Sequence, residues 1–172
     1  MSSDFLFKPY VILAVAVAVQ SFHMLEHIVQ VIQKFVLQFP VTHGILGASL
    51  DFEPVHFTFN ILYLGLIVAV WVSFTKTPIR KMQLSYALVT FVLIFQSWHF
   101  IEPTVKLYQH FVNGCVSCPG ILGHYFDVIL LHFTYNTIVY VPLIVVFAIF
   151  QYKFVVKAEG IQKEEKNDKQ LA

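Results

Sequence analysis

Charge is scarce in this chain. Only 12% of its 172 residues are charged, whereas 58% are hydrophobic, which is far from the composition of a soluble globular domain. Four apolar stretches, at about residues 5–25, 55–74, 83–101 and 125–150, approach the roughly 20 residues that a membrane-spanning helix needs. The scarcity of charge therefore excludes an ordinary soluble domain and predicts an all-α integral membrane protein with four transmembrane helices.

Several familiar catalytic motifs are missing as well. The sequence contains no nucleophile elbow, no phosphate-binding loop and no dinucleotide fingerprint. Its net charge of +1 gives no electrostatic basis for binding nucleic acid, and we expect no nucleic-acid partner. These absences exclude the corresponding enzyme classes, while enzymatic turnover of another kind stays open.

Cysteine is limited to Cys115 and Cys118, which form the sequence CVSC. Two cysteines at this spacing can form a disulfide in an oxidising compartment, or they can offer two soft metal ligands. The pair is therefore the candidate disulfide of the chain, and the spacing alone does not separate the two roles.

Basic residues are distributed unevenly about the four spans. Of the 11 Lys and Arg residues, only Lys34 and Lys106 lie on the side of the two longer connections, 38–54 and 103–120. Basic residues are retained on the cytoplasmic side of short loops, so we predict a plasma-membrane protein with both termini in the cytoplasm. Residues 153–172 mix basic and acidic side chains and are predicted to be a solvated, poorly ordered cytoplasmic tail.

Polar residues within the apolar spans recur 76 positions later. QSFHMLEH begins at Gln20 and QSWHFIEP at Gln96, while HFTFN begins at His56 and HFTYN at His132. Internal repeats dictate architecture, and each copy holds two spans, so both copies should have the same orientation. We predict two tandem helical hairpins, related by a pseudo-twofold axis along the membrane normal and packed as a four-helix bundle. The expected units are residues 1–78, residues 79–152 and the tail, 153–172.

The polar side chains present in both copies define a candidate metal site. Ionisable groups within a membrane span are costly, and they usually face the bundle interior, where they pair or bind something. Imidazoles and carboxylates that meet there would form a ligand set for a transition metal such as Zn, Cu or Fe. The expected ligands are His23, Glu26, His56, His99, Glu102 and His132.

Neighbouring side chains are expected to orient these ligands, since outer partners fix imidazole tautomers and carboxylate positions. Asp51 and Asp127 have a second interpretation, as N-caps of the returning helices. The expected outer partners are Gln20, Asn60, Gln96, Asn136, Asp51 and Asp127. The histidines without a histidine counterpart are interpreted as peripheral, and they are His27, His43, His110 and His124.

These expectations describe a small membrane metalloprotein, in metal handling or redox chemistry, with its site at the extracytoplasmic end of the bundle. One alternative is an accessory or structural subunit of a larger membrane complex, whose polar cluster is an interhelical network and whose partners are lipid and other membrane subunits. A b-type haem is a further alternative, but Phe22, Met24, Trp98 and Phe100 are bulky neighbours and the glutamates would have no role. Because the inner halves of the spans are dry, a path across the membrane is not expected.

Overall fold

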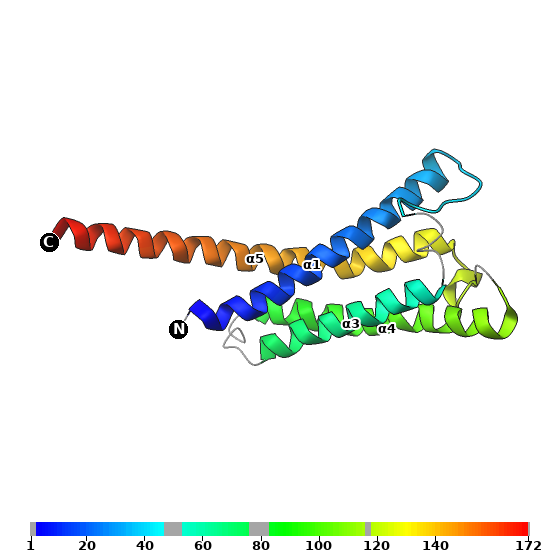
Figure 1. The fold of residues 1–172 in the computed structure, drawn as a ribbon, viewed down its shortest axis with the longest axis horizontal. Coiled ribbons are helices and arrows are strands. Elements are labelled where there is room, and N and C mark those ends of the chain that lie inside the picture. Colours follow the sequence, from blue (N-terminus) through cyan, green and yellow to red (C-terminus); the bar gives the residue numbers. More distant parts are fainter. Residues whose placement is uncertain (1–2, 47–52, 76–82, 116–117, 172) are drawn as a thin grey trace.

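The described part of the chain is helical and elongated. The computed structural model describes residues 3–46, 53–75, 83–115 and 118–171, and Figure 1 shows their helices lying lengthwise against one another. The long helices are α1 (Ser3–Val31), α3 (Glu53–Thr75), α4 (Gln83–Asn113) and α5 (Val128–Leu171). A π-helical turn, Ile32–Val36, continues α1, and a 3-10 turn, Leu122–His124, precedes α5.

Four segments in the described residues are long and apolar enough to cross a membrane. They are Pro9–Val36, Pro54–Thr75, Gln83–Asn113 and Val128–Lys153. The prediction of an all-α integral membrane protein with four spans is thus confirmed at this level. Both termini lie at one end of the molecule, and the described parts of the two longer connections lie at the other (Figure 1). We call the second end, which carries residues 37–46 and 118–127, the loop end.

The third span is longer than its hydropathy indicated. We expected a connection to begin at Pro103, but α4 continues through this residue to Asn113. Proline lacks one backbone donor, so within a helix it weakens a single turn and does not always end the helix. The sequence of the first span predicts the end of the third span better than hydropathy does. The helical pattern of the first span runs to about Leu37, and Asn113 lies 76 positions after Leu37.

The last helix also continues beyond its apolar span. α5 remains helical past Lys153 to Leu171, and Figure 1 shows this extension projecting beyond the other helices. The structure thus gives this segment as helix, and its solvated, cytoplasmic character stays a prediction. Its many Lys, Glu, Gln and Ala residues are good helix formers, so local propensity favours continuation.

The half of the bundle nearer the termini has an apolar core. Each helix contributes fully buried side chains to it, among them Leu13, Ile67, Val92 and Leu143. α1 packs most extensively on α5, and α3 on α4, while α1 with α3 and α4 with α5 also pack together. The helices that pack most closely therefore belong to different expected hairpins.

Candidate metal centre

Five imidazoles, supplied by all four long helices, lie next to one another in the half of the bundle nearer the loop end. Ring centroids are separated by 4.5 Å for His23 and His27, by 5.0 Å for His56 and His132, and by 6.0 Å for His99 and His132. Four of these residues are buried, and the fifth, His56, has its Nε2 atom enclosed. We call His23, His27, His56, His99 and His132 the imidazole cluster.

Oxygen acceptors hold the Nδ1 atoms of three cluster histidines. Nδ1 of His132 lies 2.9 Å from the Val128 carbonyl oxygen, and Nδ1 of His27 lies 2.9 Å from Gln30 Oε1. His99 has a longer contact of the same kind, at 3.4 Å, with an amide oxygen one turn earlier. Because these oxygens only accept, Nδ1 carries the proton and Nε2 presents a lone pair. Metal-ligating histidines in proteins have this arrangement.

The Nε2 atoms of the cluster have few partners. Those of His56, His99 and His132 are buried and lack a hydrogen-bond partner among the described residues. The Nε2 atoms of His23 and His27 lie 3.0 Å apart. A buried polar atom without a partner is unfavourable, and imidazole nitrogens bind zinc at about 2.0–2.1 Å. The cluster therefore offers several enclosed nitrogen donors, two of them within reach of a single ion.

The donors are near one another but are not yet arranged as ligands. Among the residues that the structure describes, no three His, Cys, Asp or Glu side chains are positioned to hold one ion. The close nitrogen pair belongs to one helix, and the nearest imidazoles of other helices are centred 5.7 Å from His23 and 5.9 Å from His27. A third ligand would have to rotate toward this pair, which terminal side-chain torsions allow.

Both predicted carboxylate ligands bind the connections at the loop end. Glu26 accepts a hydrogen bond from the N–H of Ile45 at 2.9 Å and also bonds the next residue. Glu102 accepts from the N–H of Ile121 at 2.9 Å and from the next residue at 2.9 Å. The structure thus brings the predicted histidines together, while it directs the predicted glutamates to backbone donors.

A glutamine and a glycine complete each of these attachments. Gln33 donates to the Gly44 carbonyl at 3.1 Å and accepts from its N–H at 2.9 Å, and Gln109 repeats both bonds with Gly120 at the same distances. The glycines have φ values of +68° and +72°, a region that favours glycine. We call each set a clasp. The first clasp is Glu26, Gln33 and Gly44, and the second is Glu102, Gln109 and Gly120.

A layer of amides borders the cluster on the side toward the termini. Gln20 donates to Asn136 Oδ1 at 2.7 Å, and its counterpart Gln96 donates to Asn60 Oδ1 at 3.4 Å. Each asparagine also donates to the carbonyl of the histidine four residues earlier, at 2.9 and 2.8 Å. Of the four amides predicted to orient ligands, Gln96 contacts an imidazole nitrogen, that of His99.

Of the two aspartates predicted to orient ligands, the structure describes Asp127, which directly precedes α5. Oδ1 of Asp127 accepts from the N–H groups of Ile129 and Leu130, at 3.1 Å each, and Oδ2 forms an ion pair with Lys34. Burial alone would raise the pKa of Asp127, but Lys34 and the backbone donors hold this pKa below its ordinary value. Asp127 therefore caps α5, which is the second of its two interpretations. Asp51 lies outside the described residues.

His27 is the cluster member that sequence reasoning missed. It was interpreted as peripheral because its counterpart in the repeat is Pro103. A usable signal was present, since two histidines four residues apart share one helix face, and His23 and His27 have the spacing at which helices bind zinc. Candidate ligands were chosen because they occur in both copies, so His27, which occurs in only one copy, was left out.

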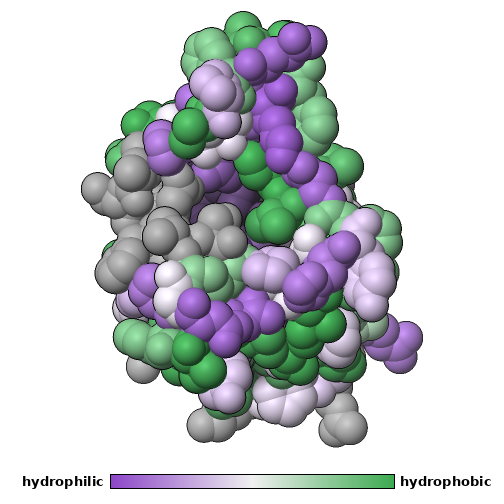
Figure 2. Space-filling view, turned by 90° about the vertical axis from the view of Figure 1, so that its right-hand side faces the viewer, coloured by the Kyte–Doolittle hydropathy of each residue, from purple (hydrophilic) through white to green (hydrophobic). Residues whose placement is uncertain are grey.

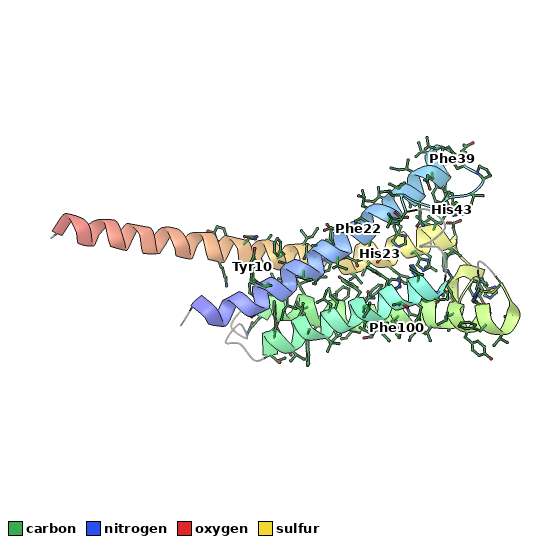
Figure 3. All side chains as sticks on the ribbon, in the orientation of Figure 1. Tyr10, Phe22, His23, Phe39, His43 and Phe100 are labelled. Carbon is green, nitrogen blue, oxygen red and sulfur yellow. A yellow bond between two sulfur atoms is a disulfide. The ribbon has the colours of Figure 1, made fainter. Side chains whose placement is uncertain are left out.

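The remaining histidines lie outside the cluster. His43 and His124 are exposed, and Figure 3 shows His43 near the loop end, beyond His23. His110 donates from Nδ1 to the Cys115 carbonyl at 2.7 Å. Cys115 forms a disulfide with Cys118 within the connection between α4 and α5.

A buried lysine lies two turns beyond His99 on α4. Lys106 is the one Lys or Arg among the buried side chains of the described residues, and its Cγ lies next to Gly120 of the second clasp. In the repeat it takes the place of Gln30, the residue that binds His27. The surroundings of the cluster are therefore not the same in the two halves.

No family model, curated protein or solved structure matches the chain. Fold and composition define its class, an all-α integral membrane protein with four spans. Within that class the buried imidazole cluster is the chemical feature from which a function can be argued.

Proposed function

We propose that the protein is a membrane metalloprotein that binds a transition-metal ion through the imidazole cluster. The observation that carries this proposal is the set of enclosed Nε2 atoms on His56, His99 and His132, none with a partner in the described residues. Polar groups within a membrane span are costly and usually serve a function. Five imidazoles gathered from four helices exceed what interhelical hydrogen bonding needs, because three of their five Nε2 atoms have no hydrogen-bond partner within the part of the chain that the structure describes.

The donor chemistry favours particular ions. Neutral imidazole suits Zn, Cu, Ni and Fe, and among divalent first-row ions Cu²⁺ binds a given nitrogen site most tightly. The glutamates are occupied by the clasps, so we propose a ligand set made of histidine alone. This revises the expected His/Glu set by replacing Glu26 and Glu102 with His27.

Haem is a poorer fit to the same residues. His23 stacks on Phe59 with ring centroids 4.1 Å apart, and His99 lies 4.9 Å from the ring of Tyr135. A macrocycle between two axial histidines would have to displace these aromatic rings as well as the other imidazoles. A single ion needs only side-chain rotation.

We further propose that the chain is a duplicated hairpin with pseudo-twofold symmetry. Both clasps, both amide pairs and both asparagine-to-carbonyl bonds recur at an offset of 76 positions. The packing of α1 on α5 and of α3 on α4 fits the same relation. An axis along the membrane normal would place the imidazole cluster on or near it.

The proposed orientation puts the loop end outside and both termini in the cytoplasm of a cell whose plasma membrane holds the protein. Its support is the distribution of Lys and Arg about the spans. The imidazole cluster would then lie in the outer half of the membrane. Surface labelling of Asn113→Cys, an exposed position at the loop end, tests this, and labelling only after permeabilisation would reverse it.

Elemental analysis and an absorption spectrum of the purified full chain test the metal proposal. We expect bound transition metal, or stoichiometric uptake of Cu²⁺ or Zn²⁺ by metal-depleted protein. Protein that carries no metal and takes up neither ion would sink the proposal. The imidazole cluster would then be an interhelical network, and the exposed Phe22, Trp98 and Phe111 would favour the role of a subunit that packs against other membrane proteins.

A further inference from the structure

The imidazole cluster is closed on the side toward the termini. The amide layer of Gln20, Asn60, Gln96 and Asn136 borders it there, and the next turns of the helices contribute a fully buried apolar core. A hydrated ion would have to leave its water behind to cross this core, and apolar side chains offer nothing in exchange. Exchange of an ion from this side is therefore blocked.

The opposite side of the cluster is polar. Toward the loop end, the buried side chains include Gln30, one turn beyond His27 on α1, and Lys106, two turns beyond His99 on α4. Figure 1 shows α1 running obliquely to the other helices and diverging from them toward the loop end. Figure 2 looks onto this end and shows a hollow near its middle, with hydrophilic residues deep inside and hydrophobic ones on part of its wall.

We propose that the imidazole cluster exchanges its metal ion with one compartment only, the one that the loop end faces. This inference rests on the proposed function and adds the direction of access and the form of the ligand, a hydrated divalent cation. The ion enters by the hollow and trades water for imidazole nitrogen, one water leaving for each nitrogen that binds. The same geometry assigns the protein to metal capture or use at one membrane face and excludes passage of the ion to the other face.

Vesicles containing the full, metal-loaded chain test the direction of access. Two marker variants at exposed sites report orientation, Asn113→Cys at the loop end and Tyr152→Cys toward the opposite end. An impermeant maleimide, added before and after detergent, gives the fraction of each marker that faces outward. An impermeant chelator added outside then removes metal, which is measured after the vesicles are separated from the medium.

The removed fraction should equal the fraction of Asn113→Cys that is labelled from outside, and detergent should release the remainder. Removal that follows the Tyr152→Cys fraction instead, or that exceeds the outward Asn113→Cys fraction, would overturn one-sided access. Retention of metal even in detergent would overturn exchange through an open hollow. Failure of any metal to bind at the start would be a failure of the proposed function, and it is seen before the chelator is added.

Discussion

The two hairpins of this bundle are alike where they fasten their connections and unlike where they supply donors. Both have a clasp with the same bond lengths between glutamine and glycine. At the imidazole cluster, however, α1 contributes His23 and His27, whereas α4 contributes His99 and has Pro103 at the second position. The comparison shows that the two clasps make the same hydrogen bonds, whereas α1 and α4 supply different numbers of imidazoles to the cluster.

Substitution of the histidine at the centre of the imidazole cluster should have the largest effect on metal affinity. His132 has ring contacts with His27, His56 and His99, so His132→Ala should lower metal affinity more than about 100-fold, beyond the 10–100-fold typical of outer partners. Isothermal titration with Cu²⁺ measures this. The exposed His43→Ala is the control, and equal binding by the two variants would contradict the ligand assignment.

A pair of counterparts should respond alike if both halves serve one site. His23→Ala and His99→Ala are expected to reduce bound metal to a similar degree, because each removes one donor from equivalent positions of α1 and α4. Metal content per protein, measured by elemental analysis, gives the comparison. Loss in one variant alone would assign the site to a single hairpin.

The unlike pair, His27 and Pro103, permits a gain as well as a loss. His27→Gln should remove one nitrogen donor and weaken binding by at least about tenfold, whereas Pro103→His should add an imidazole at the equivalent position of α4. Electron paramagnetic resonance of bound Cu²⁺ reports the change in nitrogen coordination. Identical spectra for the natural protein and both variants would show that this position is remote from the ion.

The clasps should be sensitive to a single methyl group, equally in both halves. A Cβ on Gly120 would lie 2.5 Å from Glu102 Oε1, and one on Gly44 would collide with Glu26. Gly44→Ala and Gly120→Ala should each lower the free energy of unfolding by more than the roughly 1–2 kcal/mol of left-handed strain. Unfolding in a graded detergent mixture measures the change.

Two other glycines separate strain from collision. Gly114 has φ +67° with open space around its Cβ position, and Gly65 lies in α3 with open space and no positive φ. Gly114→Ala should therefore show strain alone, and Gly65→Ala should be neutral or stabilising by up to about 1 kcal/mol. Equal losses at Gly44, Gly114 and Gly120 would remove the collision with the carboxylate from the explanation.

Substitutions in the two amide pairs should affect stability and metal binding to different degrees. The Gln20 bond to Asn136, at 2.7 Å, is shorter than the Gln96 bond to Asn60, at 3.4 Å, and membrane hydrogen bonds contribute about 0.6 kcal/mol on average. Gln20→Leu should therefore destabilise the fold more than Gln96→Leu. Gln96→Leu should weaken Cu²⁺ binding more, because Gln96 contacts His99. The reverse ranking in detergent unfolding and titration would contradict this division.

The smallest effect concerns pH and the capped start of α5. Since the pKa of Asp127 is lowered in the folded protein, its carboxylate stabilises the fold at neutral pH, and this contribution is lost as the pH falls through the lowered pKa. Asp127→Asn should unfold slightly more easily than the natural protein at pH 7, and the difference should shrink as the pH falls below the ordinary aspartate pKa of about 4 and vanish below the lowered pKa. A gap that widens in acid would reverse the sign.

The sequence predicted those features that depend on pattern. Low charge and four apolar runs determine the spans, and the recurrence of polar residues identified four of the five clustered histidines and four of the five buried amides. Burial of these side chains could be foreseen because exposure of an amide or imidazole to lipid is unfavourable. Such arguments need only composition and helical spacing.

Features that depend on the path of a connection were not predictable. Glu26 is taken by backbone donors only because the chain turns at Gly44 with a positive φ, and no helical periodicity describes that turn. The same holds for Glu102 and Gly120. His27 was missed for the opposite reason, since the periodic signal was present but the comparison of the two copies outweighed it.

The bond between Gln20 and Asn136 bears on how the protein is made. Its partners are separated by 116 positions, so α1 leaves the ribosome and enters the bilayer long before the asparagine exists. Until then the Gln20 amide lies in a segment whose partner on α5 is still to be synthesised, a costly situation in lipid. The first helices must therefore wait beside the insertion machinery, or beside a chaperone with polar groups of its own, until α5 arrives.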